Sequence, residues 1–249
     1  MKAIVIGAGR GRRLMPSTAD APKCFSEIGG RRILDWTVAA FAAHVIERIC
    51  FIGGYRIEKV RAAYPAFAFH HNTDWEQNNI LASLMCAESE MDGPFVCCYS
   101  DVLFTPEVLG RLLASPAEIA LVVDTRWQER YAQRSEHPAA DAEKVEARDG
   151  AILRIHRDIP AERAHGEFIG VAKFGAGGAN ALREHYARCR RQYEGRPFRE
   201  AQEFKKAYLI HLLQEMLESG VSMAHVDIAG GYMEIDTQQD FELARRLWR

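Results

Sequence analysis

The chain has 249 residues, and its 32 lysines and arginines against 34 aspartates and glutamates give a formal net charge of −2. A chain of this length can bury a substantial core, as one domain or as one domain with an insertion. The near balance of charge argues against a general nucleic-acid binder or a protein held to membrane surfaces by charge.

The cysteines and histidines follow no recognisable metal or disulfide pattern. The six cysteines include no C-x-x-C pair, and most lie in apolar surroundings where cysteine acts as a small hydrophobic side chain. The nine histidines have no metal-ligand spacing, so the sequence predicts no zinc site. We identify no signal peptide and no long apolar span, and we expect a cytoplasmic protein in a reducing compartment that binds no membrane.

The first informative motif lies within residues 3–23. An apolar, β-branched run at 3–6 predicts a buried parallel strand. Glycines and arginines then alternate up to a Pro-Lys pair, and the residues concerned are Gly7, Gly9, Arg10, Gly11, Arg12, Arg13, Pro22 and Lys23. Glycines let backbone N–H groups approach an anion, and arginines add bidentate donors to phosphate. The motif therefore predicts a polyphosphate site, most simply one for a nucleoside triphosphate.

Three other interpretations of this loop fit less well. A dinucleotide-binding G-x-G-x-x-G would need a glycine where Arg12 stands, and the strand that ends at Gly53-Gly54 offers no acidic residue for a ribose. A P-loop would need G-K-[ST] after the glycines, which this sequence lacks. A tight strand-to-helix turn that binds no ligand would not require three arginines.

Strand and helix patterns alternate along the rest of the chain. The expected strands are 46–52, 67–70, 94–100, 118–123, 166–174 and 221–228, and the expected helices are 32–44, 56–64, 83–90, 105–113, 175–192, 203–219 and 238–249. Residues 128–141 have no apolar period and predict a surface loop or lid, and Asp149-Gly150 predicts the turn of a hairpin over 144–156. The alternation predicts an α/β fold with a doubly wound, mostly parallel sheet.

Polar side chains follow two of the predicted strands. Asn78 and Asn79 carry amides that can read the edge of a pyrimidine base, and Ser83 opens the helix that follows. Asn and Ser are also preferred helix caps, and the residues alone leave both interpretations open. Asp101 follows the strand at 94–100, at the edge of a parallel sheet where ligands gather. Facing a triphosphate, this carboxylate would be a Mg²⁺ ligand, and the alternative is a cap for the next helix.

Three separated segments resemble a known family, the nucleotidyltransferases that activate sugar 1-phosphates and related phosphates. The first reads G-A-G-R-G-R-R-L-M-P-S-T followed by D-A-P-K, and although Gly7, Arg12 and Ser17 depart from the family pattern, its glycines, arginine and lysine are kept. The second, W-E-Q-N-N-I-L-A-S-L at 75–84, looks like the cytidylyltransferase branch that includes phosphocholine and phosphonate cytidylyltransferases. The third, G-Y-M-E-I-D-T-Q-Q-D at 231–240, is similar to the family's segment that supplies a second metal-binding aspartate.

The resemblance implies a role for each candidate residue. Mg²⁺ would bind Asp101 and Asp236, and the groups acting on the phosphates during transfer would be Lys23 and Arg13. The nucleotide would contact Ala8, Gly9, Gly11, Arg12, Asn78, Asn79 and Ser83, and the acceptor would contact Lys144, Arg157, Glu167, Tyr208 and Tyr232. The alternatives are exposed hairpin charge for Lys144 and Arg157, a pair with an arginine for Glu167, and core packing for the tyrosines.

The resemblance also implies a Rossmann-like single domain over residues 1–249, with a lid or acceptor-binding insertion at about 125–170. The implied reaction transfers CMP from CTP to a small phosphate or phosphonate and releases pyrophosphate. Candidate acceptors are 2-aminoethylphosphonate, a hydroxyalkylphosphonate, phosphocholine or a polyol phosphate. Arg157 stands where a lysine is usual and Met233 where a tryptophan is usual, which favours an acceptor without a quaternary amine.

Two other functions stay open at this point. A sugar-1-phosphate nucleotidyltransferase that uses UTP or dTTP would share the first loop and both aspartates, although the segment around Asn78 speaks against it. A non-catalytic nucleotide-binding regulator of the same fold would be expected to lose Lys23, Asp101 or Asp236, and this chain keeps all three. The oligomeric state, a homodimer included, is also open.

Overall fold

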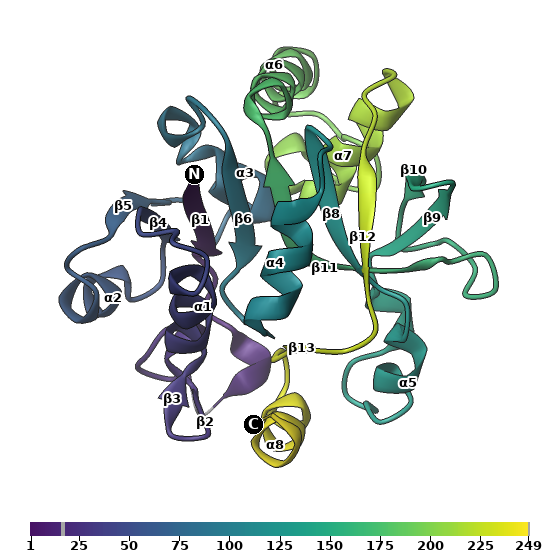
Figure 1. Cartoon of the computed structure of the whole chain (residues 1–249). Coiled ribbons are helices and arrows are strands. Elements are labelled where there is room, and N and C mark those ends of the chain that lie inside the picture. Colours follow the sequence, from purple (N-terminus) through teal and green to yellow (C-terminus); the bar gives the residue numbers. More distant parts are fainter. Residues whose placement is uncertain (16–17, 249) are drawn as a thin grey trace.

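The computed structural model describes residues 1–15 and 18–248, so Pro16 and Ser17 of the first motif lie outside the described residues, as does Arg249. Within the described part, nine strands form one sheet in the order β5-β4-β1-β6-β11-β8-β12-β10-β9 (Figure 1). Its strands are β1 (Lys2–Gly7), β4 (Ile49–Gly53), β5 (Ala68–His71), β6 (Phe95–Tyr99), β8 (Ile119–Asp124), β9 (Lys144–Arg148), β10 (Ala151–Ile155), β11 (Gly166–Phe174) and β12 (Ala224–Ile228). Two short pairs lie apart from it, β2 (Glu27–Ile28) with β3 (Arg31–Arg32) and β7 (Val102–Phe104) with β13 (Tyr232–Glu234).

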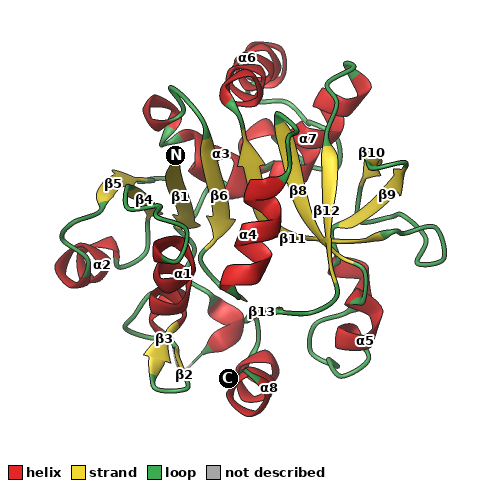
Figure 2. Ribbon diagram, in the orientation of Figure 1, coloured by secondary structure: helices red, strands yellow, loops and turns green. Residues whose placement is uncertain are grey.

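Helices cover both faces of the sheet (Figure 2). Alternate residues of β1 point to opposite faces, because Ile4 and Ile6 join one buried cluster whereas Ala3 and Val5 join the other. The helices packed in the first cluster are α3 (Ile80–Met85), α6 (Ala176–Tyr193) and α7 (Leu209–Glu218). Those of the second are α1 (Ile33–Ala42), α2 (Ile57–Ala63) and α4 (Pro106–Ala114). The predicted doubly wound α/β architecture is confirmed.

Most strands of the sheet run in one direction. β5, β4, β1 and β6 are parallel, and so are β8 and β12. β11 is antiparallel to both β6 and β8, and β10 is antiparallel to both β12 and β9. The sheet is therefore mostly parallel, as predicted, and two of its strands, β11 at the centre and β10 near one edge, run in the opposite direction.

Two predicted helices begin later or earlier than expected. α3 begins at Ile80 rather than at Ser83, because the Asn79 side chain accepts a hydrogen bond from the Ile80 N–H at 2.8 Å and caps the helix. The single helix predicted over 203–219 is shorter, since residues 204–206 form a separate 3₁₀ turn and α7 starts at Leu209. The corrections matter because both segments border the cavity described below.

Residues 128–141, predicted as a surface loop or lid, pack against the C-terminal segment of the chain. The helix α5 (Trp127–Tyr131) leads into them, and Tyr131, Arg134 and His137 are buried. Arg134 Nε lies 2.6 Å from Asp240 Oδ1, at the start of α8 (Gln238–Leu247). Most residues of this segment are exposed, as the prediction of a surface loop expects, but Tyr131, Arg134 and His137 are buried because they contact one another.

Replacing Arg134 with methionine should lower the free energy of unfolding by about 3–5 kcal/mol, because the buried Asp240 carboxylate would lose its cation. Urea denaturation measures this change. The matched control is Arg126→Met, since Arg126 pairs with Glu129 where the two side chains are 58% and 61% exposed, and it should cost less than about 1 kcal/mol. Equal losses in both variants would contradict the burial argument.

The range 125–170 contributes α5, the hairpin β9–β10 and the first half of β11. The hairpin and β11 belong to the main sheet, so part of this range extends the sheet. No helix in the described residues combines the length and the apolar character that crossing a bilayer demands.

Candidate active site

A cavity of about 610 Å³ opens beside the carboxyl ends of β1 and β6. Ligands of open α/β sheets bind at this edge. The predicted residues that line it are Ala8, Gly9, Gly11, Arg12, Arg13, Lys23, Asn78, Asn79, Ser83, Asp101, Arg157, Glu167, Tyr208, Tyr232 and Asp236. Residues not predicted for the site also line it, among them Trp75, Tyr99, Ser100, Tyr131, His137, Asp141, Glu143 and Glu234.

The Lys23 ammonium lies between the carboxylates of Asp101 and Asp236. Its Nζ is 2.7 Å from Asp101 Oδ2 and also donates to Asp236 Oδ1. Asp101 lies in the turn that follows β6. Its backbone oxygen accepts a hydrogen bond from the Ile235 N–H at 2.9 Å, and this bond holds the neighbouring residue Asp236 beside Asp101. Burial lowers the pKa of Lys23, but the two carboxylates outweigh burial and hold that pKa above its ordinary value. Lys23 is therefore a fixed cation at neutral pH.

Arg13 places a second cation beside the Asp236 carboxylate. Its guanidinium donates to Asp236 Oδ2, and its Nη1 lies 3.6 Å from Asp141 Oδ2. Burial raises the pKa of Asp236, but Lys23 and Arg13 outweigh burial and lower it below its ordinary value. Asp236 is therefore ionised at neutral pH, in a cluster where positive and negative charges alternate.

Each glycine of the first loop occupies its position for a different structural reason. Gly11 has a φ of +68°, in the left-handed region, and a Cβ there would lie 3.2 Å from the Lys23 side chain. A Cβ on Gly7 would lie 2.6 Å from the Phe51 ring, so Gly7 is required by packing. A Cβ on Gly9 would meet no atom within 4 Å. Gly9 therefore leaves room at the cavity for a ligand to approach the backbone.

The amides of Asn78 and Asn79 are engaged within the protein. Asn79 Oδ1 caps α3, and Asn79 Nδ2 donates to the Lys206 backbone oxygen at 3.2 Å. Asn78 exchanges two hydrogen bonds with Asn72, at 2.8 and 2.9 Å, and Asn72 also donates to Ser83 Oγ at 2.9 Å. Helix capping is thus confirmed for Asn79. Base recognition by this segment stays a prediction, and Asn72, which orients Asn78, carried no signal of its own in the sequence.

Arg157 and Tyr208 form another part of the cavity wall. The Arg157 guanidinium lies 4.1 Å from the centroid of the Tyr208 ring, and its Nη2 lies 3.3 Å from Glu143 Oε1. The Tyr99 hydroxyl donates to Glu143 at 3.3 Å. Burial raises the pKa of Glu143 to about 7, against the lowering effect of Arg157. Sequence analysis did not select Glu143, whose only signal was its place at the start of the predicted hairpin.

Glu167 pairs with an arginine, as one of its two sequence interpretations expects. It accepts hydrogen bonds from Arg130 and from the Tyr131 hydroxyl, the latter at 2.7 Å. Arg130 also pairs with Asp124, and its guanidinium lies 4.6 Å from the centroid of the Tyr232 ring. The carboxylate of Glu167 is therefore held in place on the cavity wall, and Tyr232 packs against an arginine.

Lys144 is the one predicted site residue that does not line the cavity. Its side chain is buried, with Nζ 5.9 Å from the centroid of the Trp127 ring, and burial lowers its pKa. Its burial is at odds with an exposed hairpin charge, and acceptor binding by Lys144 stays a prediction.

His137 and Glu234 were not predicted for the site. His137 Nδ1 lies 3.6 Å from Glu234 Oε2 and 3.8 Å from Asp236 Oδ2. Glu234 had a sequence signal, its place two residues before Asp236 in the third motif. His137 had none, because it lies in a polar segment without periodicity.

The donor set at Asp101 and Asp236 fits the Mg²⁺ that the sequence resemblance implies. Both side chains present carboxylate oxygens to the cavity, and oxygen is the donor that Mg²⁺ prefers. The shared contact with Lys23 shows that the two carboxylates are close enough to hold one cation between them.

Comparison with known proteins agrees with this geometry. A CTP:phosphoglutamine cytidylyltransferase of Campylobacter jejuni is 26% identical over 255 aligned positions, which cover 98% of each chain. A 2-aminoethylphosphonate cytidylyltransferase of Lancefieldella rimae is 28% identical over 109 residues, 42% of this chain and 44% of that one. The solved structure of a CTP:phosphocholine cytidylyltransferase from Streptococcus pneumoniae superposes with a TM-score of 0.78 at 18% identity, over 100% of this chain and 99% of that one.

The family model for the MobA-like NTP transferase domain matches residues 3–203, from β1 through the loop that follows α6. This range holds the glycine-arginine loop, Lys23 and Asp101, and the match to the Campylobacter jejuni relative extends over Asp236 as well. The chain therefore belongs to the MobA-like NTP transferase domain family and is a nucleotidyltransferase.

Proposed function

We propose that this nucleotidyltransferase transfers CMP from CTP to a small acceptor that carries a phosphoryl group and a protonated amine, and that it releases pyrophosphate. The observation that carries the proposal is that one cavity joins the glycine-arginine loop and the Lys23 cluster to the wall formed by Arg157 and Glu143. The relatives add support, because the acceptors in their names, phosphoglutamine and 2-aminoethylphosphonate, both combine a phosphoryl group with an amine.

The first loop would hold the CTP phosphates. Backbone N–H groups around Gly9 and the guanidinium groups of Arg12 and Arg13 supply donors for the β- and γ-phosphates. Lys23, kept protonated by its two carboxylates, would stabilise the charge that develops on the α-phosphate.

In the proposed reaction, a phosphoryl oxygen of the acceptor attacks the α-phosphorus of CTP in line. The new P–O bond forms as the bond to the bridging oxygen of the β-phosphate breaks, and pyrophosphate leaves with the electron pair. Such a transfer needs no covalent intermediate with the protein, so positioning and charge stabilisation carry the catalysis. Mg²⁺, held by Asp101 and Asp236 when bound, would supply positive charge to the phosphate oxygens.

The acceptor would lie along the wall that contains Arg157, Glu143 and Tyr208. The Arg157 guanidinium is a bidentate donor for an anionic group, and Tyr208 stacked against it fixes its plane. A buried carboxylate at Glu143 favours an ammonium group as its partner, since a cation offsets the cost of burying the charge.

Pyrophosphate release tests the proposed function directly. The purified protein with Mg²⁺ receives each of CTP, UTP, dTTP, ATP and GTP in turn, with phosphoglutamine, 2-aminoethylphosphonate, a hydroxyalkylphosphonate, phosphocholine and a sugar 1-phosphate as acceptors. The expected result is release with CTP and an amine-bearing acceptor. Release only with UTP or dTTP and a sugar phosphate would overturn the proposal in favour of sugar activation. Binding of CTP without release for any acceptor would favour a nucleotide-binding regulator.

A pH profile tests the role of Glu143. Its pKa of about 7 means that the side chain becomes charged as the pH rises from about 6 to 8. The KM for an amine-bearing acceptor should therefore fall several-fold across this range. In Glu143→Gln the KM should be higher at every pH in this range. The pH dependence of KM that comes from Glu143 should vanish, and only the pH dependence that comes from the acceptor's own phosphoryl group should remain. Identical profiles in the two proteins would exclude Glu143 as the group that binds the amine.

A further inference from the structure

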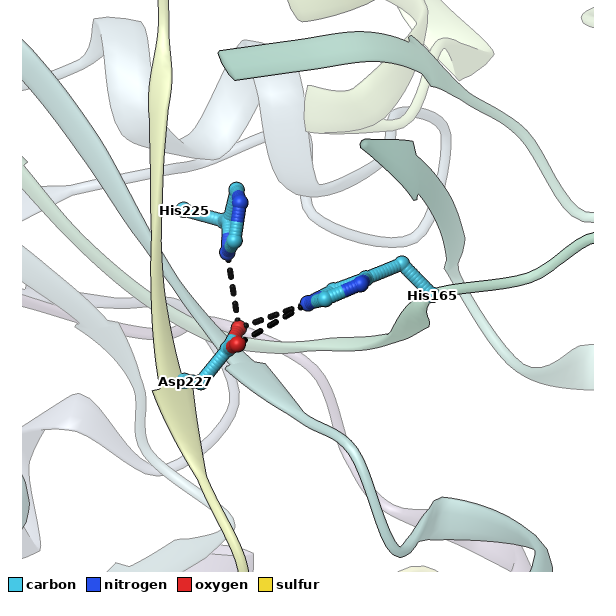
Figure 3. Close-up of side chains that lie close together, drawn as sticks. All are labelled: His165, His225 and Asp227. Atoms are coloured by element: carbon cyan, nitrogen blue, oxygen red, sulfur yellow. Dashed lines mark hydrogen bonds and ion pairs between the residues drawn. The ribbon is translucent and has the colours of Figure 1, made fainter. Parts of the chain in front are cut away.

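A cluster of two histidines and one aspartate lies outside the cavity. Figure 3 shows both imidazole rings directed at the Asp227 carboxylate from different sides. His165 Nε2 lies 2.9 Å from each oxygen of Asp227, and His225 Nδ1 lies 2.7 Å from Oδ1. One ligand atom from each residue lies within 4.8 Å of the other two. None of the three residues lines the cavity of the candidate active site.

The backbone holds the three side chains in place. His225 and Asp227 are two residues apart on β12, so both project from the same face of the strand. His165 immediately precedes β11, and its N–H donates to the Val145 backbone oxygen at 2.8 Å. The cluster therefore rests on strands of one sheet and is arranged before any ligand binds.

The distances suit one small ion. For a tetrahedral ion with bonds of about 2.0–2.1 Å, ligand atoms lie about 3.3 Å apart. The two distances between imidazole nitrogen and carboxylate oxygen, 2.9 and 2.7 Å, need to open by only a few tenths of an ångström, and the two imidazole nitrogens lie within 4.8 Å of each other. The Asp227 side chain is 43% exposed and that of His165 is 32% exposed, which leaves access for the ion and for a water molecule as a further ligand.

We propose that His165, His225 and Asp227 form a binding site for a divalent transition-metal ion of the Zn²⁺ or Co²⁺ type. Two imidazole nitrogens and one carboxylate are the donors that such ions prefer, whereas Mg²⁺ prefers oxygen donors alone. The chain would then hold two chemically distinct cation sites, because the carboxylates of Asp101 and Asp236 offer only oxygen. Binding would tie the start of β11 to β12 and so stabilise the fold.

Titration with Co²⁺ in the presence of excess Mg²⁺ tests the proposal. The expected result is one equivalent bound, with a visible absorption spectrum that indicates nitrogen and oxygen ligands rather than thiolate from any of the cysteines. At a hundredfold excess over its Kd, the ion should raise the Tm by about 5–10 °C. No binding above the Mg²⁺ background would overturn the proposal and leave a hydrogen-bonded cluster.

Two variants and one control make the test specific. Asp227→Asn preserves the shape of the side chain, and His165→Ala changes a residue outside the strands. At least one of the two variants should therefore fold. Thermal melting of each variant without metal checks this. Each should weaken Co²⁺ binding at least about tenfold. The control is His185→Ala, since His185 lies 3.2 Å from Glu215 in a pair of similar chemistry that has no third ligand in metal-binding range among the described residues. Unchanged binding in both variants, or an equal loss in the control, would refute the assignment.

Discussion

Replacing Lys23 with alanine should lower turnover at least about a hundredfold while the protein stays folded. The reason is electrostatic, because removing one preorganised charge from the developing transition state costs about 2.7–4 kcal/mol in comparable sites. Lys23 is the cation that touches both Asp101 and Asp236, and burial keeps water from taking its place. Steady-state release of pyrophosphate with CTP and the best acceptor measures the effect, and circular dichroism verifies the fold.

Lys2 offers a matched control for this substitution. It is a buried lysine on β1 that also contacts two carboxylates, Glu90 at 3.1 Å and Asp92 at 2.7 Å, and it does not line the cavity. Lys2→Ala should therefore lower stability but change turnover by less than about threefold. Turnover of Lys23→Ala within tenfold of the unmodified protein would remove Lys23 from the proposed mechanism.

Asp101→Asn should also lower turnover at least about a hundredfold. Asparagine keeps the shape of the side chain but removes the charge that would hold Mg²⁺, so the concentration of Mg²⁺ needed for half-maximal rate should rise at least about tenfold. Structural damage should be small because the Asp101 side chain has one ion-pair partner, Lys23, among the described residues. Activity measured against Mg²⁺ concentration separates the two effects.

Asp92→Asn is the control for Asp101→Asn. Asp92 also accepts a hydrogen bond from a lysine, at 2.7 Å, but its side chain is 71% exposed on the opposite end of the sheet from the cavity-lining loop. It should leave both the rate and the Mg²⁺ requirement unchanged. A loss of rate in Asp101→Asn without any change in the Mg²⁺ requirement would argue against this residue as a metal ligand.

The sequence predicted the elements that carry one strong local signal. The buried strand before Gly7, the hairpin turn at Asp149-Gly150 and the helix capped by Thr237 each depend on neighbours in the chain. The predicted start of a helix was wrong where the sequence offered more than one capping residue. The Asn79 side chain caps α3, so the helix begins three residues before the predicted start at Ser83. The buried pairs within the segment at 128–141 escaped prediction for a different reason, because Arg134 finds its partner in Asp240, about a hundred residues away.

Local sequence by itself therefore determined the α/β class and the glycine-arginine loop, because each depends on patterns that neighbouring residues set. Asp101 became a candidate from its place after a predicted strand, and Asp236 from the resemblance to a family motif. Only the tertiary structure decided which polar side chains meet. It brought Glu143 close to Arg157, buried Lys144 near Trp127 outside the cavity, and brought His165, which precedes β11, close to Asp227 on β12. The physical reason is that strand pairing brings together residues far apart in the chain, and no spacing in the sequence records that contact.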